Sequence, residues 1–193
     1  MNRPVLACIV LATGWLAFAD ARGAAIDDLR LAETHDVSFE RFARHVSNGN
    51  PEADSIYLRT LYGHYREFCA AEDVSLAVAL AQMVHETDYL RFTGSVRAVQ
   101  YNYAGLGATS SGNPGLTFPN MRTGVAAHVQ HIKAYADAEP LATPLADPRF
   151  GLVARGSAPT VRELTGRWAT DPYYAEKLLA HAAVLLADRS ERR

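Results

Sequence analysis

The stretch SLAVALAQMVHETDYL, residues 75–90, decides the fold of this chain. Its side chains are apolar nearly all round, a pattern typical of a helix that is buried inside a domain. The polar side chains of Ser75, Gln82 and Glu86 fall on one narrow stripe, because their spacing returns to the same face of a helix. We therefore expect a central helix that carries a carboxylate at the C-terminal end of its polar stripe.

The carboxylate of Glu86 is poorly placed for stability. The C-terminus of a helix is the negative pole of its dipole, and apolar surroundings penalise a charged group, so both effects raise the pKa of the carboxyl. A protonated carboxyl is what a general acid requires. A buried ion pair of Glu86 with Arg91 or Arg97 explains the same pattern, and this helix alone does not decide between the two interpretations.

Length and composition limit the classes of protein to consider. The chain has 193 residues, of which 49% are hydrophobic, and this suits one domain with a well-packed core. The formal net charge is -2 and the arginines are scattered, so there is no basic stripe of the kind that binds nucleic acid. We therefore expect no nucleic-acid partner.

No pattern in the chain predicts a metal or another cofactor. A glycine-rich phosphate loop is absent from the sequence, and His85-Glu86 lacks the second histidine of an HExxH motif because position 89 is Tyr. His128 and His131 lie one helical turn apart, but a histidine pair without further ligands is more typical of a surface or a core than of a metal site. We expect no cofactor.

Residues 1–21 have the pattern of an export signal. Arg3 supplies the positive start, an apolar run follows, and Ala-Asp-Ala at 19–21 is a small-residue cleavage site. Because the run is too short to span a bilayer comfortably, we expect a protein that is exported to the periplasm or the cell exterior without stable membrane insertion after cleavage. Cleavage would leave Cys69 as the remaining cysteine, so we expect no internal disulfide.

Helical patterns cover most of the remaining chain. Ser38 and Asp54 are suited to cap the starts of two helices, and Asp171-Pro172 is suited to open the last one. The expected helices cover about residues 38–46, 54–71, 75–90, 123–138, 160–168 and 172–186. The expected division is a loosely ordered lead-in with one short helix at 22–54, one domain at 55–188 and a charged tail at 189–193.

The segment 95–121 has a different texture from the helices around it. Aromatic residues alternate with small ones, and glycines and prolines interrupt the run, ending in the tip sequence SSGNPG. The pattern predicts a small β-hairpin, and so long an irregular segment between core helices is more often functional than idle. The expected fold is therefore mainly α (α+β), with a β-hairpin lip over a cleft.

Four blocks of sequence resemble one enzyme family. The blocks are HETDYLRFTG, YNYAGLGAT, FPNMRTGVAAHVQHIKAYA and RWATDPYYAEKLL. In this order they resemble the peptidoglycan endo-β-N-acetylglucosaminidases, glycoside hydrolase family seventy-three, over roughly residues 55–186. The resemblance implies a lysozyme-like domain that hydrolyses the β-1,4 bond after N-acetylglucosamine in peptidoglycan glycan strands. It also implies that Glu86 is the catalytic acid.

The resemblance extends to residues that would bind the substrate. Asn102, Tyr103 and Gly105 match one family block, and Trp168 and Tyr174 match another. For Tyr103 and Tyr174, stacking on a sugar and packing in the core are equally good interpretations. Asp171 and Lys177 match the same block, but a structural role is the favoured interpretation for both, with Asp171 as a helix cap.

The sequence departs from a two-carboxylate mechanism. Most glycosidases use two carboxylates, yet no Asp or Glu occurs in residues 89–136, and Asn120 stands where relatives often have Asp. The hairpin therefore cannot supply the second group. The remaining candidates are Asp88, Asp137, Asp171 and the acetamido oxygen of the substrate itself.

Three other functions fit parts of the pattern. A lytic transglycosylase-like lyase also works with one glutamate and releases an anhydro-sugar. A catalytically silent wall-binding module would hold the glycan without cleaving it. A zinc peptidase built around His85 lacks an evident ligand set. The sequence does not indicate an oligomeric state.

Overall fold

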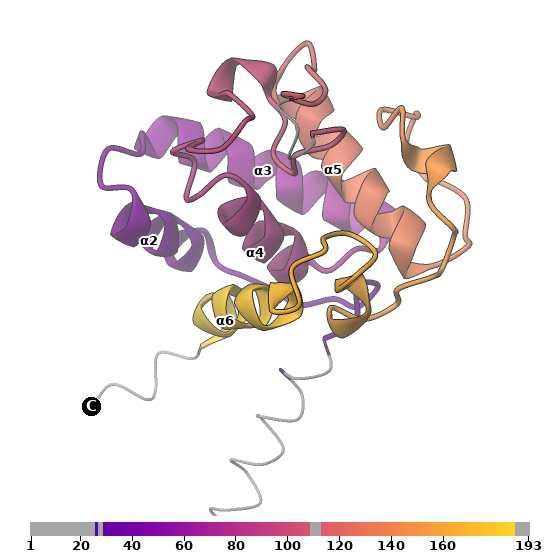
Figure 1. Ribbon diagram of the computed structural model, residues 1–193. Helices are drawn as coiled ribbons and strands as arrows, with labels where there is room; N and C mark the ends of the chain where they lie inside the picture. Colours follow the sequence, from indigo (N-terminus) through magenta and orange to yellow (C-terminus); the bar gives the residue numbers. More distant parts are fainter. Residues whose placement is uncertain (1–25, 27–28, 109–112, 188–193) are drawn as a thin grey trace, which may run out of the picture.

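The computed structural model describes residues 26, 29–108 and 113–187, so the predicted signal peptide and the charged tail lie outside the described residues. Helices make up most of this part of the chain, as Figure 1 shows. The α-helices are α2 (Phe39–Gly49), α3 (Ser55–Glu72), α4 (Leu76–Glu86), α5 (Met121–Ala136) and α6 (Tyr174–Leu186). The 3-10 helices are η1 (Ala98–Gln100), η2 (Phe150–Leu152) and η3 (Arg162–Leu164). Within the described ranges, no helix is both long and apolar enough to cross a bilayer.

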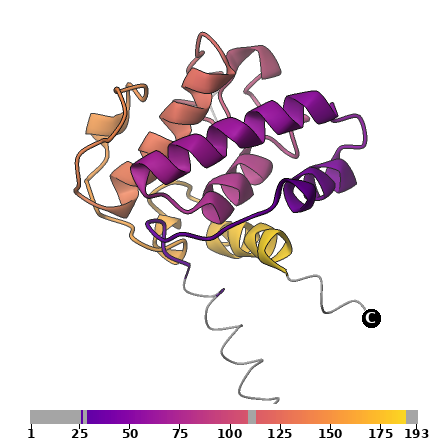
Figure 2. The ribbon, with the colours of Figure 1, turned by 180° about the vertical axis from the view of Figure 1, so that it is seen from behind.

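Helix α4 is the axis of the core, as predicted. Every residue from Leu76 to Val84 is buried, and the helix packs against α3, α5 and α6. Figure 1 shows α4 at the centre with α6 below it, and Figure 2 shows α3 crossing the opposite side of the molecule. The helix ends at Glu86 and not at residue 90, so the carboxylate lies on the last helical residue.

The segment before α2 belongs to the same core from residue 29 onward. Leu29, Leu31 and Val37 are buried, and the carbonyl of Leu31 accepts a 2.7 Å hydrogen bond from the backbone N–H of Ser75, the N-cap of α4. The expectation of a loosely ordered lead-in therefore does not hold for residues 29–37. Its buried apolar side chains and its backbone hydrogen bonds hold this segment in the core.

The starts of α2 to α5 follow side-chain capping, whereas α6 begins at Tyr174 without a side-chain cap, two residues after the start expected at Asp171-Pro172. Ser38 and Asp54 accept backbone N–H bonds at the starts of α2 and α3, as expected. Helix α5 begins two residues before the expected Thr123, because Asn120 supplies the capping oxygen. The expected helix at 160–168 is reduced to η3, since the chain turns at Gly166, whose φ is +79°.

The predicted β-hairpin is not present in the described part of residues 95–120, a segment that we call the lip. It contains η1, several turns and an isolated antiparallel bridge between Ala108 and Pro114. Gly105 and Gly107 have φ of +64° and +75°, so the backbone turns left where a strand would stay extended. The side-chain amide of Asn102 bonds backbone groups that strand pairing would otherwise use.

Candidate active site

A cleft of about 330 Å³ opens at the C-terminal end of α4. Its walls come from three parts of the chain: the turn that follows α4, the lip, and the segment before α6. Glu86, Gly105 and Trp168 all line it. The cleft therefore brings together residues from three of the sequence blocks that suggested a glycosidase.

One oxygen of the Glu86 carboxyl is held from behind by two donors. Its Oε1 accepts a hydrogen bond from the hydroxyl of Tyr174 at 2.6 Å and another from the indole Nε1 of Trp168 at 3.0 Å. Neither arginine proposed from sequence pairs with it. Arg91 bonds Asp88 instead, and Arg97 donates to a backbone carbonyl. The interpretation of Glu86 as half of a buried ion pair with Arg91 or Arg97 is therefore wrong.

The surroundings of Glu86 favour its protonated form. Burial raises the pKa of this carboxyl, and the hydrogen bonds from Tyr174 and Trp168 act in the opposite direction without cancelling the effect. The position at the C-terminal end of α4 adds to the rise, because the helix dipole is negative there. A carboxyl that keeps its proton to a higher pH than usual is suited to act as a general acid.

The second oxygen of Glu86 faces the cleft across Gly105. A Cβ atom added at Gly105 would lie 3.7 Å from Oε2, and the positive φ at this position already favours glycine. A larger residue there would fill the space in front of the carboxyl. The absence of a side chain at position 105 therefore leaves room for a substrate atom beside Oε2.

A chain of buried hydrogen bonds continues behind Tyr174. The side-chain Nε2 of Gln82 donates to the Tyr174 hydroxyl at 2.7 Å, and the Gln82 Oε1 lies 2.9 Å from Nε2 of His128. The Nδ1 atom of His128 lies 2.8 Å from the hydroxyl of Tyr65. All four side chains are at most 2% exposed, so each polar atom depends on its neighbour in the chain.

The direction of these bonds follows from the chemistry of each group. Because Gln82 gives its N–H to Tyr174, its carbonyl oxygen must accept from His128, which then carries its proton on Nε2. The Nδ1 of His128 is left to accept from Tyr65. Burial lowers the pKa of His128 to about 3, which keeps the ring neutral. Every donor in the chain therefore points toward Glu86.

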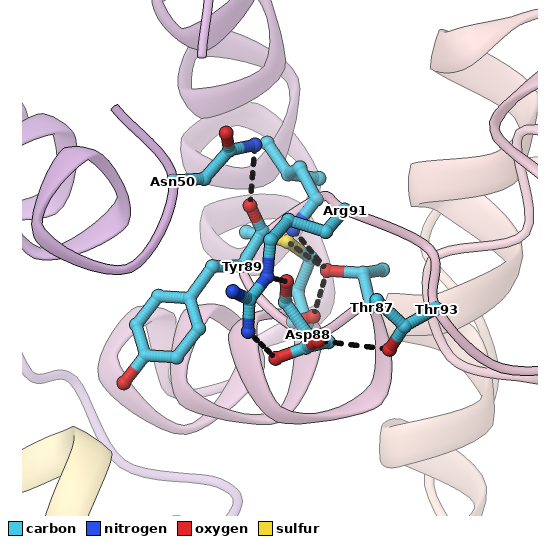
Figure 3. A network of polar contacts seen from close by, with 8 residues as sticks. Asn50, Thr87, Asp88, Tyr89, Arg91 and Thr93 are labelled. Atoms are coloured by element: carbon cyan, nitrogen blue, oxygen red, sulfur yellow. Dashed lines mark hydrogen bonds and ion pairs between the residues drawn. The ribbon is translucent and has the colours of Figure 1, made fainter. Parts of the chain in front are cut away.

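The turn after α4 has an unusual backbone (Figure 3). Asp88, Tyr89, Leu90 and Phe92 have φ of 50°, 57°, 64° and 51° without any glycine among them. Left-handed conformations cost non-glycine residues roughly 1–2 kcal/mol each. Such residues persist only where their surroundings hold them, and they cluster at functional sites.

Polar contacts drawn in Figure 3 hold this turn. The hydroxyl of Thr87 accepts the backbone N–H of Leu90 at 2.9 Å, and Nδ2 of Asn50 donates to the carbonyl of Tyr89 at 3.1 Å. The carboxylate of Asp88 accepts from the guanidinium of Arg91 and from a threonine hydroxyl at position 93. The turn directs the chain from Glu86 into the lip and forms one side of the cleft.

Of the substrate-binding residues expected from the resemblance, some line the cleft and others are buried behind it or inside the lip. Gly105 and Trp168 line the cleft, whereas Tyr174 is 2% exposed and touches Glu86 from behind. Asn102 is 1% exposed and makes three hydrogen bonds to backbone groups of the lip. Tyr103 is 0% exposed, and its hydroxyl lies 2.7 Å from that of Tyr57. Asn102 and Tyr103 therefore support the lip from inside and do not line the cleft.

The candidates for a second carboxylate are engaged elsewhere. Hydrogen bonds from Arg91 and Lys177 lower the pKa of Asp88 and Asp171, respectively. Asp137 accepts from a lysine one turn earlier in α5. Among the described residues that line the cleft, Glu86 is the one carboxylate.

Metal ligation was one alternative for the residues around His85. In the described ranges, no group of three His, Cys, Asp or Glu side chains is arranged to hold a metal ion. His181 lies beside His85, and its Nδ1 is 2.9 Å from Nε2 of His45. These histidines contact one another and aromatic rings, so the zinc-peptidase alternative gains no support from this part of the chain.

Comparison with known proteins adds independent findings. The glucosaminidase family model, described as mannosyl-glycoprotein endo-beta-N-acetylglucosaminidase, matches residues 62–185. An uncharacterized protein of Borreliella burgdorferi is 42% identical over 142 residues, which are 74% of this chain and 70% of that protein. No solved structure matches the chain. The matched region runs from α3 into α6 and contains Glu86 and every residue that touches its carboxyl.

Proposed function

This chain belongs to the glucosaminidase family, glycoside hydrolase family seventy-three, and on that premise we propose that it hydrolyses the β-1,4 bond after N-acetylglucosamine in peptidoglycan glycan strands, with Glu86 as general acid. The family supports a glycosidase that acts on peptidoglycan. The description of the family model names a glycoprotein substrate, but the bond beside N-acetylglucosamine is common to both substrates.

One observation carries this proposal. The carboxyl of Glu86 reaches a cleft with one oxygen held by Tyr174 and Trp168 and the other free to face a substrate across Gly105. Its raised pKa favours the protonated state that a leaving-group oxygen needs. The half-buried indole of Trp168 lines the same cleft and offers an apolar face on which a sugar ring can pack.

We propose that the substrate itself supplies the nucleophile. In the proposed mechanism, the 2-acetamido oxygen attacks the anomeric carbon while the bond to the leaving oxygen breaks and that oxygen takes the proton of Glu86. Water then opens the oxazolinium ring, and the Glu86 carboxylate takes one proton from this water. The lack of another carboxylate lining the described cleft favours this route. The product retains its configuration.

The groups that orient the acetamido group lie in the cleft wall. Asn102 and Tyr103 were candidates for this task, but both are buried and bonded within the lip. We assign the task to polar groups that do line the cleft, namely the hydroxyl of Ser95 and the backbone of Gly105. The buried pair instead acts by fixing the lip above Glu86.

A lytic transglycosylase-like lyase is the second candidate, because a single catalytic carboxyl suffices for it too. The two reactions differ in their products, since the lyase releases an anhydro-sugar and the hydrolase a reducing end. Mass spectrometry of digested cell wall separates them. A silent wall-binding module would give neither product.

A zymogram on purified peptidoglycan tests the role of Glu86. We expect Glu86→Gln to keep the fold and to lose roughly 100-fold to 10,000-fold in rate, the usual contribution of a positioned acid. Glu67→Gln is the matched control, because Glu67 is an exposed carboxylate of α3 that pairs with Arg122. Clearing by folded Glu86→Gln at the wild-type rate would show that the assignment is wrong.

A second experiment separates the substrate-assisted route from a distant protein carboxylate. We expect Asp88→Asn and Asp171→Asn to keep full activity, and proton NMR to show the β-anomer as the first product. An initial α-anomer would mean that water attacks directly and configuration inverts. Activity lost in either variant, at unchanged stability, would identify the missing carboxylate.

We also propose that the protein works outside the cytoplasm, where peptidoglycan lies. The basis is the export-type pattern of residues 1–21, which lie outside the described residues. Cell fractionation with N-terminal sequencing tests this proposal. A cytosolic protein that begins at Met1 would contradict it.

A further inference from the structure

A second pocket of about 230 Å³ adjoins the cleft. The two share Gly105 and Trp168, and the far wall of the second pocket carries Arg149 and Arg167 from the segment between α5 and α6. We propose that this pocket, the arginine pocket, binds a carboxylate carried by the N-acetylmuramic acid unit next to the cleaved bond. The proposal rests on the function proposed above, because it assigns the substituent of the same glycan strand to a place beside Glu86.

Within the described residues, neither Arg149 nor Arg167 has a carboxylate partner in an ion pair. In this part of the chain, no hydrogen bond or ion pair of the half-buried Arg149 side chain is found, and Arg167 donates Nη1 to the backbone carbonyl of Glu163 at 3.0 Å. Other arginines do have a carboxylate partner, for example Arg91 with Asp88, Arg122 with Glu67, Arg155 with Asp137, and Arg162 with Glu176. The positive charges of the arginine pocket are therefore available to a ligand.

The nearby carboxylate is turned away from the pocket. Asp147 is 0% exposed, and its oxygens accept from Nδ1 of His131 at 2.6 Å and from the backbone N–H of Arg149 at 2.8 Å. These bonds tie the loop that carries Arg149 to α5. They fix the position of the arginine without neutralising its guanidinium group by direct pairing.

Both guanidinium groups act on one hydroxyl in the pocket wall. Tyr135 lines the pocket and donates its hydroxyl to the carbonyl of Arg167 at 3.1 Å. Burial raises the pKa of Tyr135, and the charges of Arg149 and Arg167 act against that rise. Both arginines also line this pocket, so two positive charges border the space that a carboxylate would occupy.

The opposite end of the cleft has the opposite charge. A third pocket, of about 370 Å³, shares Phe92 with the cleft and is lined by Glu52 and Asp54. An anionic substituent is attracted to the arginine pocket and repelled from this end. The difference gives a bound glycan strand a preferred direction across Glu86.

The chemistry of the strand supplies a suitable ligand. The lactyl ether of N-acetylmuramic acid ends in a free carboxylate where the strand carries no peptide, and in a peptide with its own carboxylates where it does. Arginine binds either carboxylate through paired, charge-assisted hydrogen bonds. An oligomer of N-acetylglucosamine alone has no such group, so it fits the cleft while leaving the arginine pocket empty.

Three substrates and one double variant test the proposal. We expect Arg149→Met with Arg167→Met to lower kcat/KM roughly tenfold to a hundredfold on peptide-free peptidoglycan strands, and to leave cleavage of neutral N-acetylglucosamine oligomers unchanged. A loss on peptide-bearing strands alone would assign the carboxylate to the peptide and still support the pocket. Arg44→Met with Arg66→Met, two exposed arginines on α2 and α3, is the control with the same change of charge.

The result that would overturn the proposal is equal loss on all three substrates, or no loss on any of them. If the wild-type protein cleaves none of the three, the proposed function fails, and binding still tests the pocket. We expect N-acetylmuramic acid to change the fluorescence of Trp168 in the wild type and not in the double variant. An equal response of both proteins would then remove the pocket assignment independently of catalysis.

Discussion

The floor and the lip of the cleft keep their shapes by different means. The floor is α4 and α6 with the hydrogen-bonded chain from Tyr65 to Tyr174, and the four side chains of that bonded chain are buried. The lip is held by single polar anchors, such as the buried Asn102 and Tyr103, and by glycines that turn the backbone. The position of Glu86 therefore depends on cooperative burial from below and on a few separate bonds from above.

The strongest test of the floor is Tyr174→Phe. This change removes a hydrogen bond to the Glu86 carboxyl, and such bonds to charged groups contribute about 1.5–3 kcal/mol, so we expect a roughly tenfold to hundredfold loss of rate. The lost bond had lowered the pKa of Glu86, so the pKa rises further. A general acid fails as the pH rises through its pKa, and the upper limit of the pH–rate profile should therefore move to higher pH.

Tyr173→Phe is the control for this test, because Tyr173 is 67% exposed and precedes Tyr174 in the chain. It should leave both the rate and the pH–rate profile unchanged. An upper limit that stays in place in Tyr174→Phe would mean that this hydroxyl does not tune Glu86.

Loss of one buried side chain of the lip should lower the free energy of unfolding. Asn102→Ala removes three hydrogen bonds to Leu106 and Leu116, and at about 1 kcal/mol each we expect the free energy of unfolding to fall by about 2–3 kcal/mol. Asn113→Ala is the matched control, because Asn113 is exposed in the same lip and bonds only the nearby Gly115 N–H among the described residues. Urea denaturation measures both variants. Equal losses would contradict the importance of burial at Asn102.

As the pH falls, the floor should lose stability at a higher pH than the lip. Burial lowers the pKa of His45, and burial with neighbouring histidines lowers that of His181 to about 4. Below about pH 6.5 the unfolded chain binds protons at these rings that the folded chain binds only at lower pH, near pH 4 for His181, so stability is lost as the pH falls through this range. We expect His181→Gln to make the dependence of the urea midpoint on pH shallower. An unchanged dependence would show that this histidine does not contribute.

The smallest effect comes from two aspartates with nearly the same φ. Asp73 caps α3 with a φ of 54°, and Asp88 follows α4 with a φ of 50°. We expect Asp73→Gly to stabilise the protein by about 1 kcal/mol, because glycine adopts this conformation without the cost. Asp88→Gly should gain nothing, since it also removes the bonds to Arg91 and Thr93. Thermal unfolding of both variants decides, and equal stabilisation would mean that these bonds do not hold the turn.

The floor was largely predictable from sequence, because burial follows apolar patterns. The continuous apolar run around Gln82 predicted α4, and the end of its polar stripe identified Glu86. Capping residues such as Ser38 and Asp54 marked helix starts, since a side-chain oxygen next to an apolar run has a local role.

The lip and the turn before it were not predictable in the same way. Asp88, Tyr89 and Leu90 carry no local signal for a left-handed backbone, so the expected helix ran past Glu86. The resemblance located Asn102 and Tyr103 in a functional block, but it could not tell that both side chains point inward. Tertiary packing decides that direction, and the same holds for the pocket between the lip and the segment 138–170.

The amide of Gln82 lies in the middle of the chain of hydrogen bonds behind Glu86, and it limits proton transfer along that chain. An amide neither releases nor takes up a proton at ordinary pH, so no proton passes between His128 and Tyr174 through it. The interior therefore insulates the carboxyl while orienting it. In the proposed mechanism, each proton that Glu86 gives to a leaving group therefore has to be replaced from the cleft side, at Oε2, by the water that completes the reaction.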